Sequence, residues 1–233
     1  MTTTLTITMS TLYEKLATLG LKKDYIRKYG LPSWWDDELN DKPFAVLEGA
    51  GYIADNFNID LKSLLTLGEE VKLNPLPHTK FKQHNSKNKG HPYVAQTLAS
   101  RVAELISYGT KIEYNNLPND AQTIREEILS NHKTVNLESL LDSCWIQGIA
   151  VGYFNHFPKK TKKCSGLIQW QETSPVIILS GKHRHRAKFT FDLAHELGNL
   201  ALGHLQEWVL VDEEIKLNLI VTIMKKQQLM NLL

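Results

Sequence analysis

His195, Glu196 and Asn199 form the pattern His-Glu-x-x-Asn, which differs at one position from the zinc-binding pattern His-Glu-x-x-His. On a helix, side chains four residues apart lie about 40° apart on one face, so two histidines at this spacing can chelate one Zn²⁺. The intervening glutamate faces the metal-bound water as general base. Zinc lowers the pKa of that water to about 7 and polarises a scissile carbonyl. At position 199, this chain carries an amide where the second imidazole would be.

A helix over residues 187–203 is needed to position this pattern. Leu193, Leu197 and Leu200 recur at i, i+4 and i+7, which is the spacing of an apolar helix face. This stripe lies on the side of the helix opposite His195. We therefore expect the leucines to pack on a core while His195 and Asn199 face a cleft.

The elements around this helix predict an α+β fold. Capping residues and apolar periodicity indicate helices over residues 11–19, 22–29, 43–57, 59–65, 93–108, 118–130 and 137–147. A further helix is expected to begin at Ser33 and to carry Trp34 and Trp35. After Gly148, short runs rich in Val, Ile and aromatic residues predict a small sheet with strands over residues 149–154, 166–170 and 175–179.

Breaks in these patterns divide the chain into four parts. We predict a helical N-terminal subdomain over residues 1–70, a linker over 71–92, an α+β domain over 93–216 and an irregular tail over 217–233. The linker contains a basic stretch, residues 80–89, with four lysines and one aromatic residue.

The segment from Phe191 to Leu202 resembles the Phe-x-x-Ala-His-Glu-Leu-Gly-His-x-x-Leu segment of the ImmA/IrrE metallo-endopeptidases, whose catalytic part is the IrrE N-terminal-like domain. Residues 137–149 are similar to the helix and first strand of this family, and residues 162–180 to its sheet. Residues 12–65 are similar to the helical leader of its longer members. The resemblance therefore extends over residues 12–214.

This resemblance implies a zincin-like domain with a small mixed β-sheet and a site helix. It implies a cytoplasmic zinc protease that cleaves a DNA-bound repressor or another transcriptional regulator. His195 and the residue at position 199 would be zinc ligands, Glu196 the general base, and a glutamate on a later helix the third ligand.

The chain departs from the family pattern at Asn199. An amide oxygen is a much poorer zinc ligand than an imidazole, so zinc affinity is expected to fall steeply. His204 cannot replace it, because nine residues correspond to about 180° around a helix. Glu207 would lie about 120° around and about 18 Å along the axis.

A second departure is the segment after Leu217, which has no helical stripe and no acidic residue. The family has Glu-x-x-Ala-x-x-Phe-Ala there. The chain can be back-translated with one permitted set of codons and then read in a shifted frame from the third base of Leu219. This reading gives Asn-Arg-Tyr-Asp-Asn-Glu-Lys-Thr-Ala-Thr-Asp-Glu-Phe-Ala. That peptide is close to the helix of the family. We therefore hypothesise a truncated or frameshifted C-terminus that has lost the third ligand.

Amino-acid composition argues against nucleic-acid binding by the chain as a whole and against a membrane-spanning segment. The 27 lysines and arginines nearly balance 25 aspartates and glutamates, so the chain as a whole is not a basic nucleic-acid binder. No apolar stretch reaches the roughly 18 residues of a membrane span, which predicts a cytoplasmic protein without membrane contact. Cys144 and Cys164 are too few for a disulfide framework and are interpreted as buried thiols.

The sequence thus predicts a zinc metallopeptidase-like protein that is catalytically impaired, a pseudo-protease that binds a protein partner such as a repressor-type regulator. One alternative is a protein-binding module without catalysis. Another is a DNA-binding regulator that uses its N-terminal helices and residues 80–89. The basic residues 182–188 before the site helix could orient an acidic substrate, although they are also typical of a solvated edge.

Overall fold

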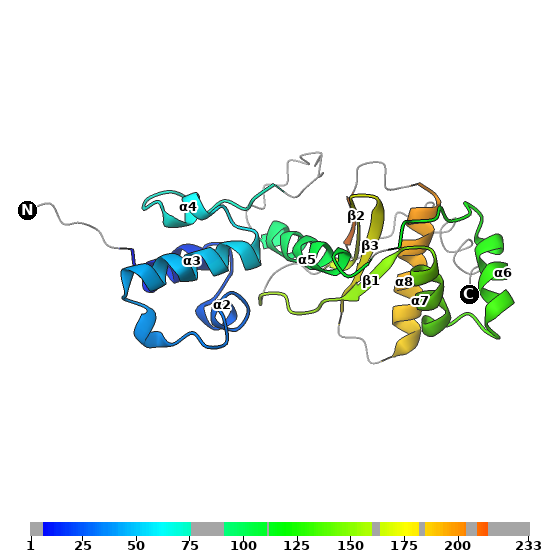
Figure 1. Ribbon diagram of the computed structural model, residues 1–233, viewed down its shortest axis with the longest axis horizontal. Coiled ribbons are helices and arrows are strands. Elements are labelled where there is room, and N and C mark those ends of the chain that lie inside the picture. The colour runs from blue at the N-terminus through cyan, green and yellow to red at the C-terminus, as the bar shows by residue number, and fades with distance from the viewer. Residues whose placement is uncertain are drawn as a thin grey trace, which may run out of the picture. The chain divides into compact units, whose positions relative to one another are not determined.

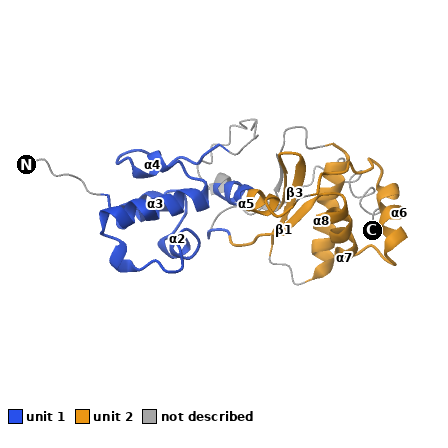
Figure 2. Cartoon of the chain, in the orientation of Figure 1, with its two compact units in different colours: residues 1–76, 83–101, 157–162 blue, residues 77–82, 102–156, 163–233 orange. Residues whose placement is uncertain are grey.

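The computed structural model describes residues 7–75, 91–110, 112–159, 164–181, 185–203 and 209–213. The chain divides into two compact units (Figure 2), which are described separately below. Unit 1 comprises residues 1–76, 83–101 and 157–162, and unit 2 comprises residues 77–82, 102–156 and 163–233. The basic residues 80–89, residues 182–184 and the tail 217–233 lie outside the described residues, as does most of the predicted linker 71–92.

Unit 1 is helical in its described residues. It contains α1 (Met9–Ala17), α2 (Lys23–Tyr29), α3 (Pro43–Phe57), α4 (Leu61–Leu65) and the first part of α5 (His91–Ser107). Their apolar stripes meet in a core of large side chains that are almost fully buried: Met9, Leu12, Leu16, Leu21, Ile26, Ile53, Ile59 and Leu64. The predicted helix over residues 43–57 is confirmed with these boundaries, since Pro43 begins it and Asn58 ends it in the left-handed conformation.

The helix predicted to begin at Ser33 is wrong. The structure has only a 3₁₀ turn there, Asp37–Leu39, and Asp36 caps it by accepting a hydrogen bond from the backbone nitrogen of Glu38. Trp35 is buried against Gly49, where an added Cβ would lie 2.6 Å from the indole ring. Trp34 remains exposed. Burial of one tryptophan on α3 therefore decided the path of this segment, and local helix signals did not.

Unit 2 is an α+β unit, as predicted. Its sheet has the order β1-β3-β2-β4, with strands β1 (Ala150–Tyr153), β2 (Cys164–Gln171), β3 (Ser174–Leu179) and β4 (Val209–Glu213). β1 pairs parallel with β3, and the other neighbours pair antiparallel, so the sheet is mixed. The three predicted strands are confirmed. The sequence interpretation missed the short β4, which pairs with β2 at the sheet edge.

Two helices cover one face of this sheet. α7 (Leu137–Ile146) and α8 (Arg186–Ala201) run side by side against it, as Figure 1 shows. Ile168 and Ile177 of the sheet share a buried core with Leu193 of α8, and α6 (Ala121–Asn131) adds Ile124 and Ile128. The core therefore fixes α8 firmly above β2 and β3.

The opposite face of the sheet receives the last turns of α5. A Cβ added to Gly152 of β1 would meet Ile106 of α5 and Ile178 of β3, so these side chains pack over the bare backbone. None of the helices in the described residues is long and apolar enough to cross a membrane.

Candidate active site

Helix α8 carries all three residues of the His-Glu-x-x-Asn pattern. Its predicted apolar stripe is confirmed, because Leu193 and Leu197 are buried in the unit 2 core. The polar side of the helix is covered as well: His195 is 9% exposed, and Glu196 and Asn199 are each 2% exposed. Both sides of α8 are thus packed against other protein atoms. The polar side is more buried than a helix side that faces the expected cleft would be.

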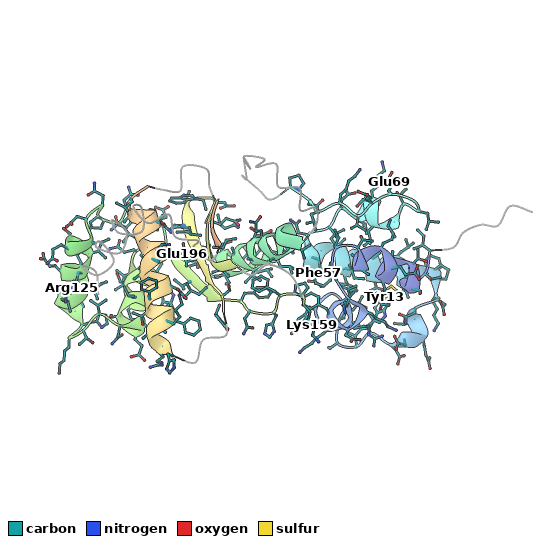
Figure 3. All side chains as sticks on the ribbon, turned by 180° about the vertical axis from the view of Figure 1, so that it is seen from behind. Tyr13, Phe57, Glu69, Arg125, Lys159 and Glu196 are labelled. Carbon is teal, nitrogen blue, oxygen red and sulfur yellow. The ribbon has the colours of Figure 1, made fainter. Side chains whose placement is uncertain are left out.

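Glu196 lies directly against the backbone of β2. Gly166 of β2 has no side chain, and a Cβ built on it would collide with Oε1 of Glu196 and lie 2.9 Å from its Cδ. Figure 3 labels Glu196 on the side of α8 that faces the strands. A glycine in a strand interior often marks a close approach of this kind. Gly166 therefore creates the space that holds the Glu196 carboxylate.

Asn199 is paired with the same carboxylate. Its side-chain nitrogen donates a long hydrogen bond to Oε2 of Glu196, with the two atoms 3.4 Å apart. Residues three apart on a helix are neighbours, so the amide reaches Glu196 within one turn. One carboxylate oxygen thus lies against Gly166 and the other accepts from Asn199. In the His-Glu-x-x-His arrangement, position 199 would instead supply a lone pair to zinc.

His195 is held by an aromatic neighbour one turn earlier. The rings of Phe191 and His195 are nearly parallel, with centroids 6.5 Å apart and an angle of 12° between their planes. Lys188 lies over the Phe191 ring, 5.2 Å from its centroid. The imidazole of His195 thus lies parallel to an aromatic ring on the same side of α8.

Asp192 is a site residue that the sequence interpretation missed. It is buried, forms an ion pair with Lys188 one turn earlier, and lies on the same side of α8 as His195 and Asn199. The signal was present in the sequence, because Asp192 precedes His195 by three residues and Asn199 by seven. The polar side of α8 therefore carries two carboxylates, one imidazole and one amide.

The described residues on this side of α8 do not by themselves form a three-ligand zinc site. A catalytic zinc takes three protein ligands, usually His, Cys, Asp or Glu. Nowhere in the described part of the chain are three such side chains grouped so that they could hold a metal ion. His195 is a suitable ligand, whereas the amide oxygen of Asn199 is a much poorer zinc ligand than an imidazole. His204, Glu207 and the segment expected to bring the third ligand lie outside the described residues.

A hollow of about 400 Å³ lies near the start of α8, away from His195. It is lined by Asn136 and Glu138 at the start of α7 and by Arg186 and Thr190 of α8. Arg186 and Glu138 form an ion pair of 3.0 Å at its surface. Thr190 and His195 differ by about 140° around the helix. This hollow is therefore separate from the His195 side of α8.

Comparison with known proteins identified no relative of this chain. No protein-family model matches the chain, and no curated protein or solved structure is significantly similar to it.

Proposed function

We propose that this chain is a zincin-like protein resembling the ImmA/IrrE metallo-endopeptidases, impaired in catalysis, that binds a protein partner of the transcriptional-regulator kind without cutting it. The observation that carries this proposal is the hydrogen bond from Asn199 to Glu196. In this hydrogen bond, the acceptor Glu196 is the residue that would act as general base. The donor Asn199 stands at the position where the family has a metal ligand.

The placement of Glu196 supports the proposal that catalysis is impaired. A glutamate that serves as general base needs one oxygen within hydrogen-bond reach of the attacking water. Here Oε1 lies against the β2 backbone at Gly166 and Oε2 accepts from Asn199. The arrangement favours a structural carboxylate that fixes α8 to the sheet.

The retained architecture supports binding. The helix and the sheet keep the polar cluster of His195, Glu196 and Asn199 together, and Phe191 and Lys188 order its surroundings. Because these three residues are 9% exposed or less, a partner would contact the surface beside them, such as the hollow lined by Glu138, Arg186 and Thr190. Direct contact with nucleic acid is not part of the proposal, because the charge of the chain is nearly balanced.

Zinc content is the measurement that tests this proposal. The protein is stripped with a chelator, incubated with one equivalent of Zn²⁺, desalted and measured by elemental analysis. We expect far less than one zinc per chain in the unaltered protein, because imidazole binds zinc much better than an amide does. Asn199→His should raise the affinity, and Asn131→His is the matched control, since it adds a histidine at an exposed position on α6.

Thermal unfolding with and without zinc provides a second readout that does not depend on activity. A ligand that binds only the folded state at a hundred times its Kd stabilises by about 2.7 kcal/mol. One zinc per unaltered chain that disappears in His195→Ala would contradict the proposal, and so would zinc-dependent cleavage of labelled casein. Zinc absent from both the unaltered protein and Asn199→His would favour the alternative of a protein-binding module without a metal site.

A further inference from the structure

An aromatic surface lies exposed at the start of α3 in unit 1. Phe44 is 89% exposed, Trp34 58% and Leu47 51%. Together with Tyr52, these residues form what we call the Trp34–Phe44 surface. Single exposed apolar side chains are common on proteins, but a group of large ones indicates an interaction site.

The helix places these side chains on one side of α3, with Phe44 and Tyr52 about 12 Å apart along the helix axis. Taking 100° per residue, Phe44 lies at the centre of the exposed side of α3, with Leu47 about 60° to one side and Tyr52 about 80° to the other. Trp34 contacts Tyr52 edge to face, with ring centroids 6.2 Å apart. The surface therefore extends from Leu47 across Phe44 to the two aromatic rings.

Packing beneath the surface holds the rings in place. Trp35, next to Trp34, is buried against Gly49. Tyr52 donates a hydrogen bond of 3.1 Å to Glu48 one turn earlier. A surface ordered before binding loses little side-chain entropy when a partner docks.

Gly51 leaves a low point in this surface. A Cβ built on it would have no neighbouring atom within 4 Å, so the backbone is bare there. It lies about 20° from Phe44 around the helix, between the positions of Leu47 and Tyr52. An apolar side chain of a partner can approach the α3 backbone at this point.

The charge around the surface is strongly acidic. Residues 33–56 contain six acidic residues and a single lysine, Lys42; the acids are Asp36, Asp37, Glu38, Asp41, Glu48 and Asp55. Asp37 is paired with Arg27 and Asp55 with Arg101. Asp41 lines a hollow together with Lys22 and Lys23, so the acidic rim beside the aromatic residues consists of Asp36, Glu38 and Glu48.

We propose that the Trp34–Phe44 surface binds a basic amphipathic helix of a partner protein. Apolar side chains of that helix cover Phe44 and Leu47, and its lysines or arginines face the acidic rim and the Trp34 ring. The acids disfavour nucleic acid and anionic membranes, which are themselves negative. A second copy would place one acidic rim against another. This inference is independent of the function proposed for α8.

The probe for this proposal is an 18-residue peptide with leucines at helical spacing, lysines elsewhere and an N-terminal fluorescein. Two control peptides carry glutamates in place of the lysines or the same residues in scrambled order. Binding to the full chain is followed by fluorescence anisotropy. Burial of one large apolar side chain contributes about 1.5–3 kcal/mol, so Phe44→Ser should raise the Kd at least about tenfold.

Charge and location are tested by two more variants. Glu48→Lys should also weaken binding, and the loss should shrink as NaCl screens the charges. Trp145→Ser is the matched control, because Trp145 is a 54% exposed aromatic residue on α7 in the other unit. Circular dichroism verifies that each variant is folded, as expected for changes at exposed positions.

The proposal stands if the lysine peptide binds, salt weakens the complex, and Phe44→Ser and Glu48→Lys reduce affinity while Trp145→Ser does not. It is overturned if the peptide fails to bind the folded chain, if the glutamate or scrambled peptide binds equally well, or if the three variants behave alike. Self-association in sedimentation that Phe44→Ser abolishes would assign the surface to a second copy and would likewise overturn it.

Discussion

Gly166 of β2 and Glu196 of α8 are in such close contact that a Cβ at position 166 would force the Glu196 side chain to shift. Because Glu196 is 2% exposed, its carboxylate has little space into which it can move. The absence of one side chain on the sheet thus sets the position of the Glu196 carboxylate, the general-base candidate of the His-Glu-x-x-Asn pattern.

Gly166→Ala is therefore expected to destabilise the protein by about 1–3 kcal/mol, the usual cost of overpacking a buried site. Urea unfolding followed by circular dichroism measures this free energy. Gly198→Ala on α8 is the matched control, because a Cβ there meets nothing within 4 Å. It should stabilise by about 0.5–1 kcal/mol, since alanine is the better helix former. Equal effects of the two substitutions would contradict the close contact.

The Asn199–Glu196 pair is expected to be coupled energetically. Asn199→Ala removes the amide and leaves a buried carboxylate with one hydrogen bond fewer, which should cost about 1–3 kcal/mol. In a Glu196→Ala background the same change should cost less, by about 0.5–1.5 kcal/mol. A double-mutant cycle of unfolding free energies gives this difference. Additive effects would show that the 3.4 Å contact contributes nothing to stability.

Lys15 of α1 is expected to stabilise unit 1 through the end of α4. Its ammonium donates to three backbone carbonyls, those of Ser63 at 2.6 Å, Leu64 at 3.0 Å and Thr66 at 2.7 Å. A cation near a helix C-terminus also complements the helix dipole. Lys15→Met keeps the aliphatic stem and should cost about 1.5–3 kcal/mol in unfolding free energy.

Lys62→Met on α4 is the control for that experiment, because Lys62 is exposed and its side chain is expected to be within about 0.5 kcal/mol of neutral. Should Lys15→Met prove as mild as Lys62→Met, the three hydrogen bonds would carry no net stability.

Asp120 should make stability depend on pH in the acidic range. Hydrogen bonds from the side chain and then the backbone of Thr123 lower the pKa of Asp120 below its ordinary value of 3.8. Because the folded-state pKa is the lower one, this stabilisation is present above the ordinary value of 3.8 and is lost as the pH falls through the folded pKa. Asp120→Asn keeps a good N-cap without the charge, so it should lose less stability than the unaltered chain between pH 5 and pH 2.

The test is a series of urea midpoints across that pH range, with the Asp120 carboxyl titration followed by NMR. Parallel pH profiles for the two proteins, or a titration at or above the ordinary value, would contradict the prediction.

Cys144 should be unreactive in the folded protein. Burial raises the pKa of its thiol, so the reactive thiolate is scarce at neutral pH. In a Cys164→Ser background, Ellman's reagent at pH 8 should label the chain slowly until urea unfolds it. Fast labelling of the folded protein would contradict the burial of Cys144 in the unit 2 core.

The sequence alone determined most elements of this protein. Periodicity and capping residues predicted the helices, including α3 and α8, because these signals are local and depend on neighbouring residues. Short runs rich in Val, Ile and aromatic residues after Gly148 predicted β1, β2 and β3 for the same reason. The sequence also placed His195, Glu196 and Asn199 on one helix, since their spacing alone fixes their angular separation.

Only the tertiary structure decided what covers those residues. The contact of Glu196 with Gly166 joins residues 30 positions apart, and no local pattern indicates which strand backbone approaches a helix. The same holds for β4, which exists only because β2 offers it an edge to pair with. The helix predicted to begin at Ser33 does not form, because Trp35 is buried in the core against Gly49 of α3. Burial of a large aromatic side chain outweighs weak local helix preferences.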